Sequence, residues 1–281
     1  MPSGSLYRLA AFTTTPEGGN PAGVWIGDVL PAPAEMQRIA AAVGFSETAF
    51  VVPERGNRRT VRYYSPEAEV PFCGHATIAA GVQLGLLEGE GEYRFDTLAG
   101  EVTVIVRSET GLPSATLVSV EPRHRPAPAP LVDAALAALR WEHADLTSDI
   151  PPALAYAGAW HLVLAVSSAE RLARLDYDFV ALKELMLSHS ITTLQLIWQE
   201  SATVFHSRNP FPVGGVVEDP ATGAAAAALG GYLRDAGLIE APVTITIRQG
   251  EALGRPSRLT VGIPAAGGIA VTGNAVVLGQ G

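Results

Sequence analysis

A short segment rich in glycine and alanine occurs twice in the chain and constrains its architecture. The first copy covers residues 71–81 and the second covers residues 220–230. Gly74, Ala76, Ala79 and Gly81 of the first copy match Gly223, Ala225, Ala228 and Gly230 of the second. The copies are separated by about half of the 281-residue chain. A repeat at half length predicts two related domains.

Each copy of the repeat is typical of a turn that leads into a helix. Alanine is the strongest intrinsic helix former, and its small side chain lets other elements approach closely. We therefore expect two helices enclosed by sheets. The N-terminus of such a helix presents unpaired backbone N–H groups and partial positive charge, which suits an anion. The alternative is a pair of core helices with tight N-terminal turns and no ligand.

Both halves of the chain predict the same order of elements: strand, helix, two strands, acidic loop, repeated helix, further strands. Residues 122–130 are rich in proline and predict a linker. The linker separates an N-terminal domain, residues 1–124, from a C-terminal domain, residues 131–269. Two short strands are expected near the end, over residues 268–272 and 275–278. The sequence leaves open whether the last one, within 270–281, joins the first domain. The fold class is α+β.

Composition and charge exclude several classes of protein. The net charge of −9 and the absence of a Lys/Arg run argue against nucleic-acid binding. No apolar run approaches the ~20 residues that span a bilayer, and the N-terminus lacks a secretory pattern. One cysteine and six scattered histidines predict neither a disulfide nor a metal site. Nucleotide-binding glycine loops and a G-x-S-x-G motif are also absent. We expect a cytoplasmic protein.

Glu47 is the first candidate for chemistry. It lies between a predicted helix over residues 33–43 and an apolar strand, and its neighbours include Phe45, Ala49 and Phe50. Partial burial raises the pKa of a carboxyl group toward the range that is useful for a general acid or base. The alternative is a surface glutamate that starts a strand.

Three further candidates flank the starts of the two repeated helices. His75 could donate a hydrogen bond or shuttle a proton, and Asp219 is favoured by the helix dipole. Both could instead only cap or fix their turns. Cys73 lies where a helix N-terminus favours a thiolate, so it could be a nucleophile or base. Its counterpart in the repeat is Thr222, which excludes a racemase with two thiols.

Five stretches of the chain carry a resemblance to a known family. They are Gly19-Asn20-Pro21-Ala22-Gly23, Phe45 to Phe50, Val70 to Thr77, Glu218 to Ala225, and Gln249-Gly250 through Gly254-Arg255-Pro256-Ser257. They are spread from residue 19 to residue 257 in the family's order. Together they make the chain resemble the phenazine-biosynthesis PhzF-like family, within the diaminopimelate-epimerase-like fold.

The resemblance implies two pseudo-symmetric domains, each a curved β-sheet or barrel wrapped around a central helix, with the active site in the cleft between them. It also implies a homodimer. The implied activity is isomerisation of a small carboxylate-bearing metabolite by glutamate-mediated proton transfer, with no cofactor and no metal. This is similar to trans-2,3-dihydro-3-hydroxyanthranilate isomerase. The alternatives are an amino-acid racemase or epimerase, and a small-molecule-binding protein with the same cleft and no chemistry.

The resemblance also assigns roles to individual residues. Glu47 matches the family's acid/base residue, and His75 and Asp219 match its supporting polar residues. Backbone at Gly74 and Gly223 matches the groups that receive the substrate carboxylate. The neighbouring candidates for substrate binding are Ser46, Cys73, Thr222 and Ala224. Many family members carry serine at the position of Ala224, so the dihydrohydroxyanthranilate substrate stays open. A racemase would use Glu47 or Cys73 on one face and Asp219 on the other.

Overall fold

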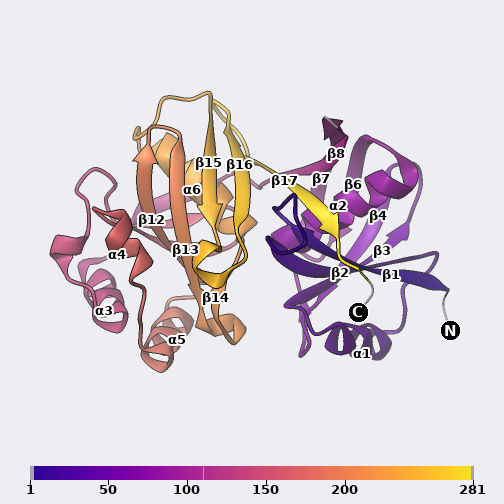
Figure 1. Ribbon diagram of the computed structural model, residues 1–281, viewed down its shortest axis with the longest axis horizontal. Helices are drawn as coiled ribbons and strands as arrows, with labels where there is room; N and C mark the ends of the chain where they lie inside the picture. The colour runs from indigo at the N-terminus through magenta and orange to yellow at the C-terminus, as the bar shows by residue number, and fades with distance from the viewer. Residues whose placement is uncertain (1–2, 110, 280–281) are drawn as a thin grey trace. The chain divides into compact units, whose positions relative to one another are not determined.

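The chain divides into two compact units (Figure 1). The computed structural model describes residues 3–109 and 111–279. Unit 1 contains the chain up to Val118 together with the residues from Thr272 onward, and unit 2 is Ser119–Val271. Each unit is a curved sheet around one helix, which is the arrangement that the repeat predicts.

Unit 1 is a ring of strands around helix α2. Neighbouring strands pair in a closed order, because the last strand pairs again with the first. A closed ring leaves no strand edge for unwanted pairing. Strands β2 and β3 run parallel, as do β4 and β6. The ring order is β1 (Gly4–Ala11), β2 (Asn20–Gly27), β3 (Glu47–Pro53), β4 (Arg58–Tyr64), β6 (Gly91–Thr97), β7 (Gly100–Glu109), β8 (Leu112–Val118) and β17 (Ala270–Val277), while the short β5 (Glu69–Val70) pairs with β4.

Helix α2 (Gly74–Glu88) fills the interior of this ring. All its residues from Gly74 to Leu84 are buried, so it has no solvent-facing side over that length. A helix that is buried all round must be small and apolar all round. At Gly81 a Cβ atom would lie 2.7 Å from Val104 Cγ1 and 3.0 Å from the Cβ of Ala115. The helix and strands β7 and β8 therefore approach as closely as glycine permits.

Helix α1 (Pro33–Val43) has the bounds that the sequence predicts. Proline in the first turn leaves no N–H group to satisfy, and Gly44 ends the helix in a left-handed conformation with φ of 72°. Met36 and Ala40 pack against the aromatic side chains of Trp25, Phe50 and Tyr64. This packing fixes the short connection from α1 into β3, at whose start Glu47 stands.

Unit 2 repeats the plan of unit 1 around helix α6 (Gly223–Asp235). The parallel pairs β11–β12 and β13–β15 correspond to β2–β3 and β4–β6. The architecture thus agrees with the predicted α+β class. The strands are β9 (Arg123–Pro126), β10 (Ala153–Tyr156), β11 (Trp160–Ala165), β12 (Thr193–Ser201), β13 (Val204–Phe211), β14 (Val216–Asp219), β15 (Val243–Gln249) and β16 (Ser257–Ile263), and the helices are α3 (Ala129–Leu139), α4 (Ala169–Ala173), α5 (Phe179–Ser188) and the 3₁₀ turns η1 (His143–Asp145), η2 (Pro212–Gly214) and η3 (Glu251–Leu253).

Two segments differ from the sequence prediction. The proline-rich stretch 122–130 contains β9, which pairs with β10, and the start of α3. Its prolines are tolerated because Pro122 precedes the strand, Pro126 ends it, Pro128 is the N-cap residue of α3 and Pro130 lies in the helix's first turn. The two short strands expected over 268–272 and 275–278 are one strand, β17. Gly273 lies within this strand. Glycine is required there by close packing, because a Cβ atom would lie 2.3 Å from the ring of Phe12.

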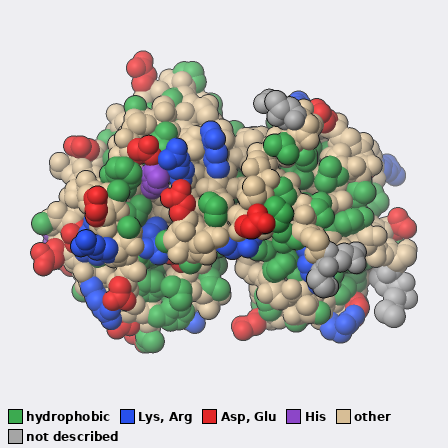
Figure 2. Space-filling model, in the orientation of Figure 1, with side chains coloured by type: hydrophobic (Ala, Val, Ile, Leu, Met, Phe, Trp, Pro, Cys, Tyr) green, Lys and Arg blue, Asp and Glu red, His purple; other side chains and the backbone are tan. Residues whose placement is uncertain are grey.

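The surface gives no sign of a membrane-crossing helix. Among the described residues, no helix is long and apolar enough to cross a bilayer. On the face shown in Figure 2, acidic and basic side chains are interspersed with apolar and neutral groups.

A buried polar network lies in the sheet of unit 2. The Nδ1 atom of His161 is 2.8 Å from Thr193 Oγ1, and the His161 ring is fully buried. Asn209 donates to Gln195 Oε1 at 2.6 Å and more weakly to Thr193 Oγ1 at 3.4 Å. Burial lowers the pKa of His161 to about 3, although its hydrogen bond with Thr193 acts in the opposite direction. The folded protein therefore holds this imidazole neutral.

This buried histidine predicts a measurable pH dependence of stability. An unfolded histidine has a pKa of about 6.5, so below that pH the unfolded chain binds a proton that the folded chain does not. Stability that is fully present above pH ~6.5 is lost as the pH falls, at about 1.4 kcal/mol per pH unit. Urea unfolding of wild type and His161→Gln between pH 7 and 5 measures this slope.

The His161→Gln variant should lose this part of the slope. The control is His143→Gln, which removes a histidine whose side chain is 70% exposed. It should keep the wild-type dependence. Equal slopes for His161→Gln and wild type would contradict the assignment.

Candidate active site

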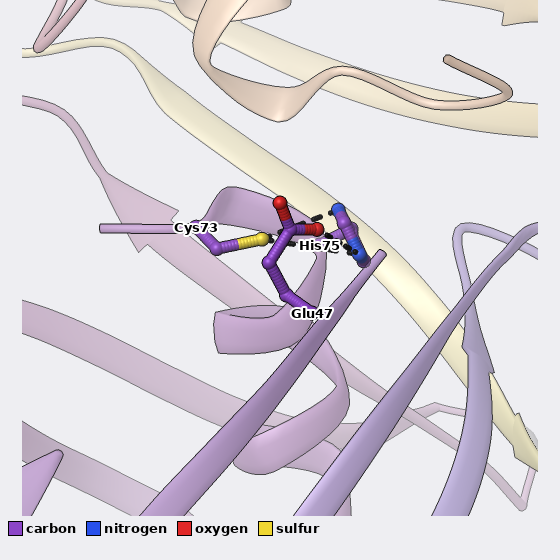
Figure 3. Close-up of side chains that lie close together, drawn as sticks. All are labelled: Glu47, Cys73 and His75. Atoms are coloured by element: carbon purple, nitrogen blue, oxygen red, sulfur yellow. Dashed lines mark hydrogen bonds and ion pairs between the residues drawn. The ribbon is translucent and has the colours of Figure 1, made fainter. Parts of the chain in front are cut away.

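The first group of candidate residues gathers where α2 begins and β3 begins. Gly44 turns the chain out of α1, and the pairing of Glu47 with Ala22 places Glu47 at the first position of β3. Cys73 is the extended residue that precedes α2, and His75 lies in the helix's first turn. Figure 3 shows the side chains of Glu47, Cys73 and His75 directed toward one another.

The imidazole of His75 joins these side chains. Its Nε2 atom is 3.3 Å from Glu47 Oε2 and 3.3 Å from Ser46 Oγ. Its Nδ1 atom is 3.3 Å from Cys73 Sγ. His75 and Cys73 are buried, and the Glu47 side chain keeps only 15% of its exposure. Gly74 lies between Cys73 and His75 in the chain. The structure thus brings together five predicted site residues, which are Ser46, Glu47, Cys73, Gly74 and His75.

This arrangement can hold and move a proton. A neutral imidazole has one N–H donor and one acceptor, and its neighbours indicate which nitrogen carries the hydrogen. With the hydrogen on Nε2, His75 donates to the Glu47 carboxylate and accepts from the Cys73 thiol at Nδ1. A carboxylate that accepts such a hydrogen bond is oriented and keeps a second oxygen for a substrate. A carboxylate held in this way is chemically able to act as a general base.

The first turn of α2 adds backbone donors to the same place. The side chain of Cys73, the residue at the N-cap position, makes no capping hydrogen bond. Thr77 instead bonds the Cys73 carbonyl twice, through its N–H at 3.0 Å and its Oγ1 at 2.7 Å. Tyr63 Oη lies 2.6 Å from Thr77 Oγ1, and burial raises the pKa of that phenol, so it stays protonated. The helix start is rigidly held and suits an anion.

The second group of candidates lies at the start of α6 in unit 2. Thr222 Oγ1 donates to Asp219 Oδ2 at 2.6 Å. Gln249 Oε1 accepts from the Thr222 N–H at 3.2 Å, while Gln249 Nε2 donates to the Asp219 carbonyl at 2.8 Å. Gly223 and Ala224 are the first two residues of the helix. The structure therefore gathers the remaining predicted residues at the start of α6.

Gln249 is a residue of this second group that sequence reasoning did not select. It belongs to a stretch that carries the family resemblance, but it lies 27 positions from Thr222, and no spacing rule connects them. Gly250, the next residue in the chain, is the sequence feature that could have pointed to Gln249. A Cβ on Gly250 would lie 2.6 Å from the Pro220 carbonyl oxygen, so the end of β15 must pass close to the α6 turn.

The two units differ at one position that matters for chemistry. Strand β12 begins at Thr193, which pairs with His161. Strand β3 likewise begins at Glu47, which pairs with Ala22. Thr193 is thus the counterpart of Glu47, and it has no titratable group. The carboxylate of the second group comes instead from Asp219, at the end of β14. A repeated fold therefore carries an asymmetric pair of acidic side chains.

Comparison with known families agrees with this geometry. The family described as phenazine biosynthesis-like protein, PhzC-PhzF, matches residues 9–281. The chain belongs to this family. The resemblance drawn from the five sequence stretches is confirmed, and the match covers nearly the whole of this PhzF-family chain.

Two curated relatives illustrate the activity class of the PhzF family. An uncharacterized isomerase of Bacillus subtilis is 29% identical over 289 residues, which cover 98% of this chain and 97% of the relative. The trans-2,3-dihydro-3-hydroxyanthranilate isomerase of Pseudomonas fluorescens is 30% identical over 281 residues, with coverage of 97% and 96%. The predicted enzyme class, isomerase, is confirmed at the level of the family.

Solved structures confirm the fold. A PhzF-family phenazine biosynthesis protein of Bacillus anthracis superposes with a TM-score of 0.85 at 25% identity, covering 98% of this chain and 96% of that one. A hydroxyproline epimerase of Agrobacterium vitis superposes with a TM-score of 0.68 at 15% identity, with coverage of 98% and 89%. The second likeness concerns the fold alone. The diaminopimelate-epimerase-like architecture is thus confirmed.

The position of Gln249 predicts a stabilising role. Gln249→Leu keeps the volume but removes a partner from the Thr222 N–H and from the Asp219 carbonyl. Removing one partner from a buried hydrogen-bonded network costs about 1–3 kcal/mol. Urea unfolding should show a loss of this size. Gln199→Leu, at an exposed position of β12, is the matched control and should change stability by less than about 0.5 kcal/mol. Equal midpoints for both variants would contradict the bridging role.

Proposed function

We propose that this protein is a cofactor-independent isomerase that moves a proton between two carbons of a small carboxylate-bearing metabolite. The observation that carries the proposal is the contact of Glu47 with His75, 3.3 Å long and largely withdrawn from water, beside the N-terminus of α2. A carboxylate in that setting is a suitable general acid and base, and such catalysis typically contributes about 10²–10⁴-fold in rate.

In the proposed reaction Glu47 removes a proton from one carbon and returns it to another on the same face. His75 holds the carboxylate through Nε2, and the Cys73 thiol holds the imidazole through Nδ1. Backbone N–H groups at Gly74 and its neighbours would receive an anionic group of the substrate. The helix dipole would add about 0.3–1 kcal/mol, and up to ~2 when partly buried.

Asp219 and the start of α6 have a supporting role in this proposal. The hydrogen bond from Thr222 keeps the Asp219 carboxylate beside the first turn of α6. The N–H groups of Gly223 and Ala224 offer a second place for an anionic oxygen. Ala224 brings no hydroxyl, so a substrate would be held there by backbone alone. The relative's substrate, dihydrohydroxyanthranilate, is accordingly the first compound to test rather than the assigned one.

A second candidate function, racemisation or epimerisation at one carbon, is favoured by Cys73. Its Sγ lies 3.3 Å from His75 Nδ1, so the thiol has a neighbour that could take its proton. A homodimer is proposed on the family resemblance, and a cytoplasmic location on the composition and the N-terminal sequence. Sedimentation at micromolar concentration tests the dimer.

Glu47→Gln tests the proposal. The amide has the same shape but cannot accept the substrate proton, so turnover should fall about 10²–10⁴-fold. The assay follows consumption of dihydrohydroxyanthranilate, then of a panel of small unsaturated and amino acids. The control is Glu67→Gln, which changes an exposed glutamate of the loop before α2. It should keep full turnover. Near-full activity of Glu47→Gln on a substrate that wild type converts would refute the assignment.

A further inference from the structure

The side chains of Glu47, Cys73 and His75 offer one oxygen, one sulfur and one nitrogen that all lie within 4.8 Å of one another. Among the described residues, this is the one group of three such donors. Figure 3 shows them converging from the start of β3 and the start of α2. We propose that these three residues bind a thiophilic divalent cation of the Zn²⁺ type, and that the bound cation reversibly blocks proton transfer.

The distances fit a zinc centre. His75 Nε2 is 3.3 Å from Glu47 Oε2 and 3.8 Å from Cys73 Sγ. Zinc bonds of ~2.0–2.1 Å to nitrogen and oxygen and ~2.3 Å to sulfur put the donors of a tetrahedral centre about 3.3–3.6 Å apart. His75 Nε2 can be the common vertex once the Cys73 side chain, whose Sγ is 3.3 Å from Nδ1 and 3.8 Å from Nε2, turns toward Nε2. Solvent would take the fourth position, since Glu47 is the most exposed of the three.

The donor set selects the class of metal. Thiolate and imidazole are ligands for Zn²⁺ and similar cations, whereas Mg²⁺ and Ca²⁺ require six or more oxygen ligands. The positive end of α2 opposes a cation, but the same helix end favours the thiolate. Thiolate and carboxylate together supply two negative charges for the two positive charges of the metal. Binding to the thiol form releases its proton to solvent while the zinc–sulfur bond forms.

The blocking effect rests on the proposed function. A metal on Glu47 and His75 Nε2 occupies the oxygen lone pair that would take the substrate proton and the nitrogen that orients it. A chelator should remove the cation and restore proton transfer, so the cation would act as a reversible inhibitor. The inferred site departs from the sequence-based expectation of no metal site, because the fold brings Glu47 to Cys73 and His75. The proposed reaction itself still uses no metal cofactor.

Cobalt titration tests the site without any substrate. Chelator-treated protein is titrated with Co²⁺, which should produce a thiolate-to-cobalt charge-transfer band and intense d–d bands of four-coordinate metal. Cys73 is the chain's only cysteine, so the charge-transfer band identifies it. Zn²⁺ should abolish the bands at one equivalent. Cys73→Ser should lose the charge-transfer band, with circular dichroism reporting that the variant is folded, and Cys73→Ala serves if it is not.

Variants of the other two ligands, and a control variant, test the site by their affinity for Zn²⁺. Glu47→Gln and His75→Gln should each weaken Zn²⁺ binding at least about tenfold, measured by competition with a chromophoric chelator, since even outer-shell changes weaken metal sites by 10–100-fold. His143→Gln, which disrupts the exposed pair of His143 with Asp133, should leave binding unchanged. Absence of the charge-transfer band, or equal competition by Mg²⁺, would overturn the site.

The inhibition is measured separately on whichever compound wild type converts. Zn²⁺ should abolish turnover at one equivalent and EDTA should restore it, with Mg²⁺ inert. Full activity of the zinc-loaded protein would overturn the blocking effect. Failure of the proposed function looks different, because Glu47→Gln would then stay active while the cobalt bands of wild type persisted.

Discussion

The close approach of α2 to the strands around it is the constraint on which unit 1 depends. The helix can stand inside the ring because glycine and alanine occupy many of its buried positions, as at Gly81 against Val104 and Ala115. Once it is enclosed, its N-terminus is held in place by the Thr77 bonds to the Cys73 carbonyl. That fixed helix end is what sets His75 beside the first residue of β3. The acid–base contact is thus a consequence of packing in the core.

The same plan serves different chemistry in the two units. Both have a parallel strand pair beside an enclosed helix, but the first position of the second strand is Glu47 in unit 1 and Thr193 in unit 2. In unit 2 that position joins a buried network of neutral polar groups, where burial keeps the His161 imidazole uncharged. Repetition explains the shared helix ends, and divergence at one strand start explains why only unit 1 carries the proposed base. The cation site inferred there uses the same three side chains.

Much of the fold follows from local sequence signals, and the exceptions have identifiable causes. Helix α1 has its predicted bounds because Pro33 and Gly44 mark both ends chemically. Strand β9 was not predicted, since its proline-rich sequence is typical of a linker and its pairing with β10 is a tertiary fact. The sequence predicted two strands on either side of Gly273, where the structure has the single strand β17. Glycine is needed there because the ring of Phe12, far away in the sequence, leaves no room for a Cβ atom.

In the candidate site, too, local sequence predicted some features and tertiary contacts determine the others. The repeat alone identified the two helix starts, and the residues beside them made Cys73, His75 and Asp219 candidates. The apolar neighbours of Glu47 made it a candidate acid or base, but its contact with His75 joins residues from different elements and was not predicted from the sequence. Gln249 shows the limit of this approach, because only the folded chain places it against Thr222.

The central claim is that Glu47 carries a proton between two carbons, and hydrogen exchange in D₂O followed by NMR tests it most directly. Dihydrohydroxyanthranilate, then the panel of small acids, is incubated with wild type and with Glu47→Gln. The account predicts that wild type forms an isomer whose accepting carbon carries hydrogen delivered by Glu47, as deuterium to the extent that the Glu47 carboxyl exchanges with D₂O, and that the variant forms neither isomer nor label. Deuterium at a single carbon with inversion, or equal labelling by Glu47→Gln, would contradict it.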